Sequence, residues 1–106
     1  MDQATVAFTD FQGNEYARIY FTHGGTSLAM TLHQFFSDER DRNRRQVNWY
    51  HLRFQHPMFL AARFVAYALT DNGQKVGVVP PTFKDGHHFV VTCPQTDNED
   101  PVVEET

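Results

Sequence analysis

Residues of different size and polarity alternate in two neighbouring segments at the start of the chain. Residues 4–9 form the first segment, and residues 15–22 form the second after an interruption at residues 10–14. The interruption contains Gly13 and Asn14, which both tolerate a positive φ. A period of two on each side of a turn predicts two strands joined as a hairpin.

The second predicted strand has two faces of different character. Its odd positions Ala17, Ile19 and Phe21 are apolar and are expected to meet the core, because side chains alternate across a strand. Its even positions hold Tyr16, Arg18 and Tyr20. Tyrosine and arginine are enriched in protein interfaces. The even face is therefore a candidate interaction surface.

A helix is predicted after the break at residues 23–25. Thr26 or Ser27 can cap it. The apolar residues that follow recur at i, i+4, i+7 and i+8, which is the stripe of an amphipathic helix. They are Leu28, Leu32, Phe35 and Phe36. The helix is expected to reach about Asp38, and the charged residues 38–45 fit either a longer helix or a loop.

The middle of the chain contains one clear element and one that cannot be assigned. Residues 46–55 fit neither a strand nor a helix well, so residues 38–55 as a whole stay open between helix and loop. His56-Pro57 marks a boundary, because proline restricts the residue before it and suits a first helical turn. Residues 57–69 are then apolar with helical spacing and rich in alanine, which predicts a second helix.

Two strands are predicted near the end of the chain. Residues 74–79 form the first, ended by two prolines, and residues 87–93 form the second. The turn residues Lys84-Asp85-Gly86 lie between them and predict a second hairpin. The fold class is therefore α+β, in the order ββ-α-α-ββ. We expect an antiparallel sheet of about four strands with the helices packed on one face.

Composition divides the chain into a neutral body and an acidic tail. The 106 residues are enough for one domain, and 15 of them are Phe, Tyr or Trp, which we expect mainly in the core. Residues 95–106 hold five acidic residues and no basic one. The remaining eight acids and nine bases nearly balance. We therefore predict a single α+β domain over residues 1–94 and a disordered acidic tail over residues 95–106.

The sequence shows no sign of export or of membrane insertion. Cys93 is the only cysteine, so no intramolecular disulfide can form. The N-terminus has no basic stretch followed by an apolar run, and no apolar run is long enough to cross a bilayer. We expect a cytoplasmic protein without a membrane partner.

Neither a metal site nor a cysteine nucleophile is expected. The six histidines show no spacing typical of zinc ligands, and His87 and His88 are adjacent in a strand and point to opposite faces. His87 and Cys93 would share a face but lie roughly 20 Å apart. We expect no catalytic residue, no metal and no cofactor.

The glycine-rich loop before the first helix is a candidate ligand site. Backbone N–H groups at a helix start attract anions, and two glycines permit close approach of a ligand. No complete phosphate-binding motif is present, so ordinary turn chemistry is the competing interpretation. The candidate ligand-binding residues are His23, Gly24, Gly25, Thr26, Tyr20 and His88.

A basic cluster lies in the charged segment that follows the first predicted helix. Arg42, Arg44 and Arg45 are the candidate nucleic-acid residues within Arg40–Arg45. The acids between them reduce residues 38–45 to a net charge of +1, which argues against phosphate binding. Trp49 and Tyr50 follow closely and could stack on bases or serve an interface.

Several segments resemble a group of small uncharacterised proteins of phages and other mobile elements. The likeness rests on the strand end Ala17-Arg18-Ile19-Tyr20-Phe21-Thr22-His23-Gly24-Gly25, the helix over residues 59–65, and strands over residues 75–79 and 88–93. The group usually has Asp-Gly after the histidine, where this chain has Gly24-Gly25. The resemblance covers roughly residues 15–93. It implies an accessory protein of mobile DNA, such as a phage or gene cassette, and brings no known activity.

Three functions are ranked on these observations. The first is a non-catalytic binding or protein-interaction module, which either self-associates as a homodimer through an exposed sheet edge or the Tyr16/Tyr20 face, or binds another protein. Its interface candidates are Tyr16, Arg18, Tyr20, Trp49 and Tyr50. The second is a small-ligand or enzymatic site around His23-Gly24-Gly25. The third is nucleic-acid binding through Arg40–Arg45.

Overall fold

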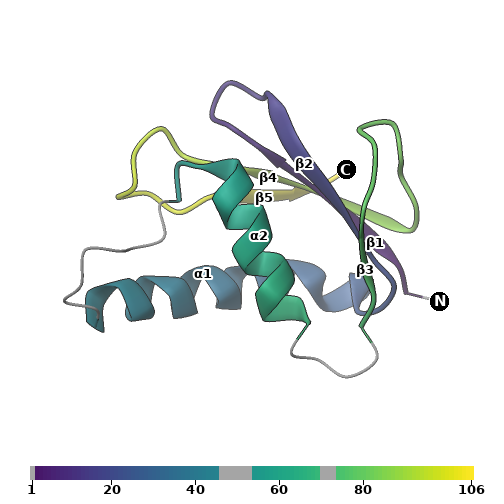
Figure 1. Cartoon of the computed structure of the whole chain (residues 1–106), viewed down its shortest axis with the longest axis horizontal. Helices are drawn as coiled ribbons and strands as arrows, with labels where there is room; N and C mark the ends of the chain where they lie inside the picture. Colours follow the sequence, from purple (N-terminus) through teal and green to yellow (C-terminus); the bar gives the residue numbers. More distant parts are fainter. Residues whose placement is uncertain (1, 46–53, 70–73) are drawn as a thin grey trace.

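The computed structural model describes residues 2–45, 54–69 and 74–106. The first hairpin comprises β1 (Ala4–Thr9) and β2 (Glu15–Phe21). A 3-10 turn at Gly25–Ser27 leads into α1 (Leu28–Arg45), and α2 (Pro57–Ala68) follows. The remaining strands are β3 (Val76–Val78), β4 (His87–Thr92) and β5 (Val102–Glu105). Two helices and a five-stranded sheet confirm the α+β class (Figure 1).

The charged segment after the first apolar stripe is helical. Residues 38–45 belong to α1 and are supported by ion pairs one turn apart, Glu39 with Arg42 and Asp41 with Arg44. The helical alternative therefore holds for these residues. Residues 46–53 of the open segment lie outside the described residues, and residues 54 and 55 form a turn.

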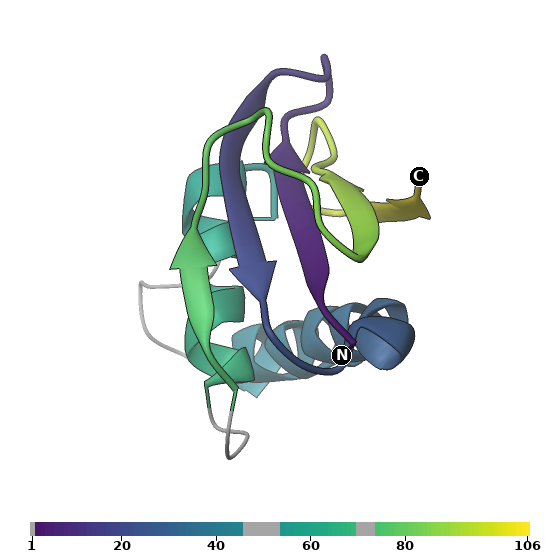
Figure 2. The same cartoon turned by 90° about the vertical axis from the view of Figure 1, so that its right-hand side faces the viewer.

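The sheet is mixed, with the strand order β3-β2-β1-β4-β5. The predicted C-terminal hairpin is wrong, because β3 pairs with β2 whereas β4 pairs in parallel with β1. The segment between them, residues 79–86, crosses over β2 and β1 on the face away from the helices (Figure 2). We call it the crossover segment.

Specific contacts hold the crossover segment on the sheet. Arg18 donates from Nη1 to the carbonyl oxygen of Phe83 at 2.7 Å. The hydroxyl of Thr5 donates to the carbonyl oxygen of Asp85 and accepts from its N–H. The turn residues therefore continue a crossing connection instead of closing a hairpin.

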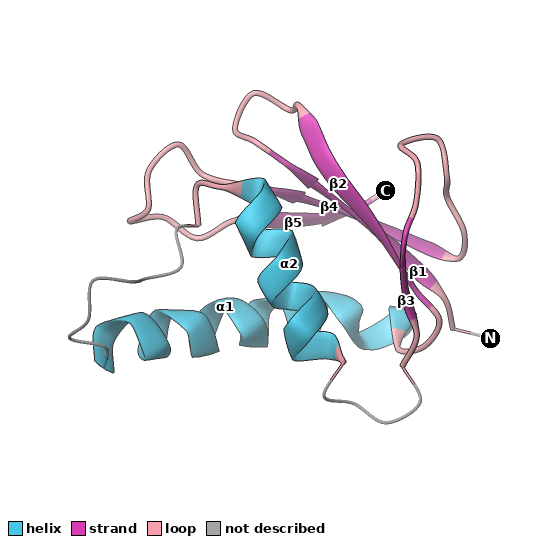
Figure 3. Cartoon of the chain, viewed as in Figure 1, coloured by secondary structure: helices cyan, strands magenta, loops and turns pink. Residues whose placement is uncertain are grey.

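The core lies between the sheet and the two helices, which cover one face (Figure 3). Ile19 and Phe21 are buried on that face, as predicted for the odd positions of β2. Phe64 of α2 is fully buried, and aromatic rings surround it at centroid distances of 5.2 to 6.3 Å. These rings are Phe8, Phe21, Phe35 and Tyr67. Most of the aromatic residues that the structure describes belong to the core or pack against it.

The acidic tail belongs to the fold, so the prediction of disorder over residues 95–106 is wrong for the strand that it contains. β5 pairs with β4, and Val103 packs against the core. Arg40 of α1 bonds the tail at three points, the Asp100 carboxylate and the carbonyl oxygens of Asp97 and Glu99. Composition alone could not predict this ordered tail, because its acidic residues pair with basic residues that are distant in the sequence.

None of the described helices is long and apolar enough to span a lipid bilayer.

Candidate functional site

The two edges of the sheet differ in chemical character. β3 forms one edge, and its residues Val76, Gly77 and Val78 carry no charge. β5 forms the other edge and carries Glu104 and Glu105. Charged side chains on an edge strand discourage pairing with another chain, and an uncharged edge of β-branched residues lacks this protection. β3 is therefore the open edge of this fold.

The hydrogen-bond register shows which groups of β3 face outward. Lys75 accepts a bond from Thr22 N–H, and Val79 donates to the carbonyl oxygen of Arg18. Alternate residues of an antiparallel strand face the partner, so Lys75, Gly77 and Val79 face β2. The N–H and C=O groups of Val76 and Val78 then point away from the sheet. We call these two residues and Gly77 between them the β3 edge.

The side chains of the β3 edge are unevenly buried. Val76 pairs with Phe21 and packs against the core. Val78 pairs with Ile19 on the same face of the sheet, yet 83% of its surface is exposed. A β-branched apolar side chain is thus presented next to unpaired backbone groups.

Gly77 has no evident role within its own chain. Its φ is not positive, and a Cβ built on it would meet no atom of the described residues within 4 Å. The pairing of β2 with β3 has no bulge at this position. A glycine inside a strand often marks a place where another backbone or a ligand comes close.

The glycine-rich loop lies beside a cavity of about 200 Å³. His23 and Gly24 line it together with Tyr67 and Gln74. The Gln74 amide is occupied by the backbone of His23, and the Tyr67 hydroxyl donates to Asp38. The cavity exists as the ligand hypothesis requires, but these two polar groups are already bonded inside the fold.

The other candidate ligand residues lie elsewhere. Gly25 is buried near the Gln3 carbonyl, and Thr26 donates from its N–H and hydroxyl to Asp2. Tyr20 and His88 lie on the face away from the helices, where Tyr20 packs against Phe83. The six candidates are therefore spread over three places instead of converging on one.

The even face of β2 is partly covered by the chain itself. The guanidinium of Arg18 forms a bidentate pair with Glu15 and also bonds the crossover segment. Tyr20 lies under that segment, and Tyr16 is 51% exposed. Trp49 and Tyr50 lie outside the described residues. Of the interface candidates that the structure describes, Tyr16 is the most accessible.

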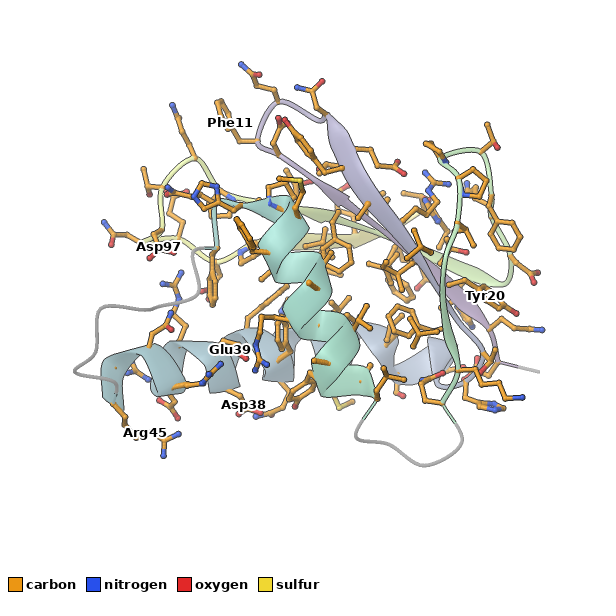
Figure 4. All side chains as sticks on the ribbon, viewed as in Figure 1. Phe11, Tyr20, Asp38, Glu39, Arg45 and Asp97 are labelled. Atoms are coloured by element: carbon orange, nitrogen blue, oxygen red, sulfur yellow. The ribbon has the colours of Figure 1, made fainter. Side chains whose placement is uncertain are left out.

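The arginines of α1 are largely engaged by acids. Figure 4 labels Asp38, Glu39 and Arg45 among the charged side chains of this helix. Arg40 binds the tail and lies over the Phe54 ring at 4.2 Å. Arg42 pairs with Glu39, Arg44 pairs with Asp41, and Arg45 donates to a backbone oxygen of α1. Phosphate binding would have to replace these internal pairs, which makes it less favourable.

One acidic residue is buried between the helices. Glu39 is 3% exposed and accepts hydrogen bonds from Arg63 of α2 as well as from Arg42. A buried carboxylate is retained only when its charge is paired. This cluster therefore joins α1 to α2 and is structural.

Burial favours the neutral forms of both Cys93 and His88. Burial raises the pKa of Cys93 to about 12, so its thiol stays protonated. Burial also lowers the pKa of His88, with Arg18 and Lys84 adding to the effect. In the part of the chain that the structure describes, no three His, Cys, Asp or Glu side chains are grouped to hold a metal ion.

His87 joins both ends of the chain. Its Nδ1 lies 2.8 Å from Glu105 of β5, and its Nε2 lies 3.3 Å from Asp2. The hydrogen bond to Glu105 is the main reason why the pKa of His87 is raised, and the charges of both carboxylates contribute. A raised pKa in the folded state adds stability below about pH 6.5, and this stability is lost as the pH rises through the folded pKa.

We therefore predict that the attachment of β5 weakens as the pH rises through the raised pKa of His87. The protection factor of the Thr106 amide, which bonds the His88 carbonyl, should fall as the pH rises above about 6.5, relative to amides of β1. A His87→Gln variant should lose this pH dependence. An equal fall in both proteins would contradict the role assigned to His87.

Sequence reasoning expected an exposed sheet edge but did not identify β3 as that edge, and it missed a surface groove at the other end of the domain. The groove measures about 290 Å³ and is lined by Phe11, Tyr16 and Met58 among others. The sequence Val-Gly-Val in a short strand was the available signal for the edge, but it indicates an interaction site only if β3 is the outermost strand. No sequence pattern indicated the groove, because its lining comes from a turn and a helix start that are distant in the sequence.

Comparisons with known proteins add no identity. The chain matches no protein-family model and is not significantly similar to a curated protein or to a solved structure.

Proposed function

We propose that this chain is a non-catalytic protein-interaction module that binds an extended protein segment along the β3 edge. The observation that carries the proposal is the contrast between the two edges. β3 is uncharged and presents Val78, whereas β5 carries Glu104 and Glu105. Strand addition to an open edge is a common mode of peptide recognition.

The binding mode follows from the register of β3. An added strand would satisfy the N–H and C=O groups of Val76 and Val78. Each hydrogen bond contributes about 0.5–1.5 kcal/mol net, and burial of a valine side chain contributes about 1.5–3 kcal/mol. Association costs at least about 4 kcal/mol, so a short peptide should bind weakly, with a Kd on the order of 10⁻³ M.

Binding is favoured over catalysis because the candidate polar groups are dispersed. His23 lines the cavity near α1, while Tyr20 and His88 lie on the opposite face of the sheet. General acid–base or nucleophilic chemistry needs such groups within hydrogen-bond reach of one another. The mobile-DNA origin implied by the resemblance stays a prediction.

A titration tests the proposal. The probe is a capped peptide with the sequence of residues 74–79, added to dilute ¹⁵N-labelled protein and followed by NMR. We expect shifts concentrated on Val76 and Val78 amides, because these groups gain partners. Val78→Lys should abolish them. Val102→Lys, which changes a 54% exposed valine on β5, should leave them unchanged.

Two results would contradict the proposal. One is the absence of shifts at millimolar peptide. The other is a set of shifts centred on the His23 cavity, which would favour the small-ligand site instead.

A further inference from the structure

We infer that the segment bound by the β3 edge is β3 of a second copy of this chain, paired antiparallel about a two-fold axis through Gly77. The inference rests on the proposed function and names its partner. Three features of the described residues support it: the hydrogen-bond pattern, the glycine and the distribution of charge.

The hydrogen-bond pattern of the β3 edge is self-complementary. When Gly77 faces Gly77 of the second copy, Val76 of each chain faces Val78 of the other. Val76 and Val78 both point their backbone groups outward, so each such pair exchanges two hydrogen bonds. All outward groups of the β3 edge are then satisfied, which a closed two-fold interface requires.

Gly77 fits the position on the axis. It would form a non-hydrogen-bonded pair, in which the two Cα atoms approach to about 4.5 Å. A glycine in a strand costs roughly 0.5–1 kcal/mol relative to alanine. Among the described residues nothing requires a glycine here, since its φ is not positive and the space beside it is open. A strand glycine often marks a place where a second backbone comes close.

The side chains also match across the axis. Val76 and Val78 lie on the helix-covered face, opposite Phe21 and Ile19 of β2. The exposed Val78 of one copy would therefore lie beside Val76 of the other, which packs against its own core. Pairing would bury Val78 next to the apolar layer of the second copy.

Charge and proline limit the assembly to two copies. Lys75 would face the uncharged Val79 of the second copy, so no like charges oppose each other. Pro80 has no N–H and ends the pairing. The outer edges of the dimer would be two β5 strands with Glu104 and Glu105, which discourage further addition.

A single introduced cysteine tests the register. The native Cys93 is buried with a strongly raised pKa, so it will not react. Gly77→Cys should fold, because the new side chain enters open space. Mild oxidation should then give a disulfide-linked dimer rapidly, since opposed residues of a non-hydrogen-bonded pair meet disulfide geometry.

Two matched variants serve as controls. Val76→Cys lies on the same strand, but the two introduced cysteines would be offset by two positions in the dimer. Their Cα atoms would then be roughly 8 Å apart, which is too far for a disulfide. Val102→Cys places an exposed cysteine on β5. Both should cross-link at least tenfold more slowly than Gly77→Cys.

The outcomes separate this inference from the proposed function. Sedimentation equilibrium of the unmodified chain should show a dimer that Val78→Lys dissociates and Val102→Lys does not. A monomer at millimolar concentration, or equal cross-linking of all three cysteine variants, would overturn the second-copy inference. The proposed function would survive that result if the peptide still shifted the Val76 and Val78 amides, and both would fail if it did not.

Discussion

Gly86→Ala should destabilise the protein by at least about 3 kcal/mol. Gly86 has a φ of 65°, which costs a residue with a side chain about 1–2 kcal/mol. A Cβ at this position would also overlap the carbonyl oxygen of Gln3 and lie 2.8 Å from its carbonyl carbon. The Gln3 carbonyl cannot easily move, because it accepts a hydrogen bond from His87 N–H at 3.0 Å.

Gly13→Ala is the matched control. Gly13 has a φ of 88°, but a Cβ there would meet no described atom within 4 Å. Gly13→Ala should lower the free energy of unfolding only by the backbone strain, about 1–2 kcal/mol. Urea unfolding followed by circular dichroism measures both variants. If Gly86→Ala costs no more than Gly13→Ala, the close packing of the crossover segment on the N-terminal strand is wrong.

Phe64→Ala is expected to have an equal or larger effect, about 3–5 kcal/mol. The ring is fully buried and contacts Phe8 of β1, Phe21 of β2 and Phe35 of α1, so its loss leaves a cavity where sheet and helices meet. This is a large fraction of the roughly 5–15 kcal/mol by which a domain is stable.

Phe59→Ala changes the same residue type on the same helix where the side chain is 58% exposed. It should alter the free energy of unfolding by no more than about 0.5 kcal/mol. Thermal unfolding of the two variants distinguishes them, and similar midpoints would contradict the placement of Phe64 at the centre of the core.

Local periodicity predicted the elements of this fold well. The apolar stripe from Leu28 to Phe36 and the odd face of β2 report contacts made within one helix or one strand, and both are buried as expected. The extension of α1 to Arg45 could be read either way, because i,i+3 ion pairs support a helix only when the chain already follows one.

Strand pairing could not be predicted, because it depends on contacts between distant residues. Lys84-Asp85-Gly86 has the composition of a hairpin turn. The bond from Arg18 to Phe83, 65 residues apart in sequence, instead holds this segment across the sheet. The order of the tail could not be predicted for the same reason, since Asp100 pairs with Arg40 and Glu105 with His87 only in the folded chain.

The sequence predicted the type of interaction surface but not its location. An exposed sheet edge or the Tyr16/Tyr20 face were the expected surfaces, and the crossover segment covers Tyr20 (Figure 4). That leaves the edge as the better supported of the two. Which strand is outermost follows from the order of the whole sheet, so the importance of Gly77 is visible only once that order is known.

The most direct test of the account is amide hydrogen exchange of β3 as a function of protein concentration. The Gly77 N–H faces β2 and should be protected at every concentration, whereas the Val76 and Val78 N–H groups point away from the sheet. We predict that Val76 and Val78 become protected together as the concentration rises, while the outward amides of Val103 and Glu105 on β5 do not. Rapid exchange of Val76 and Val78 at all concentrations, or protection that grows first on β5, would contradict pairing through the β3 edge.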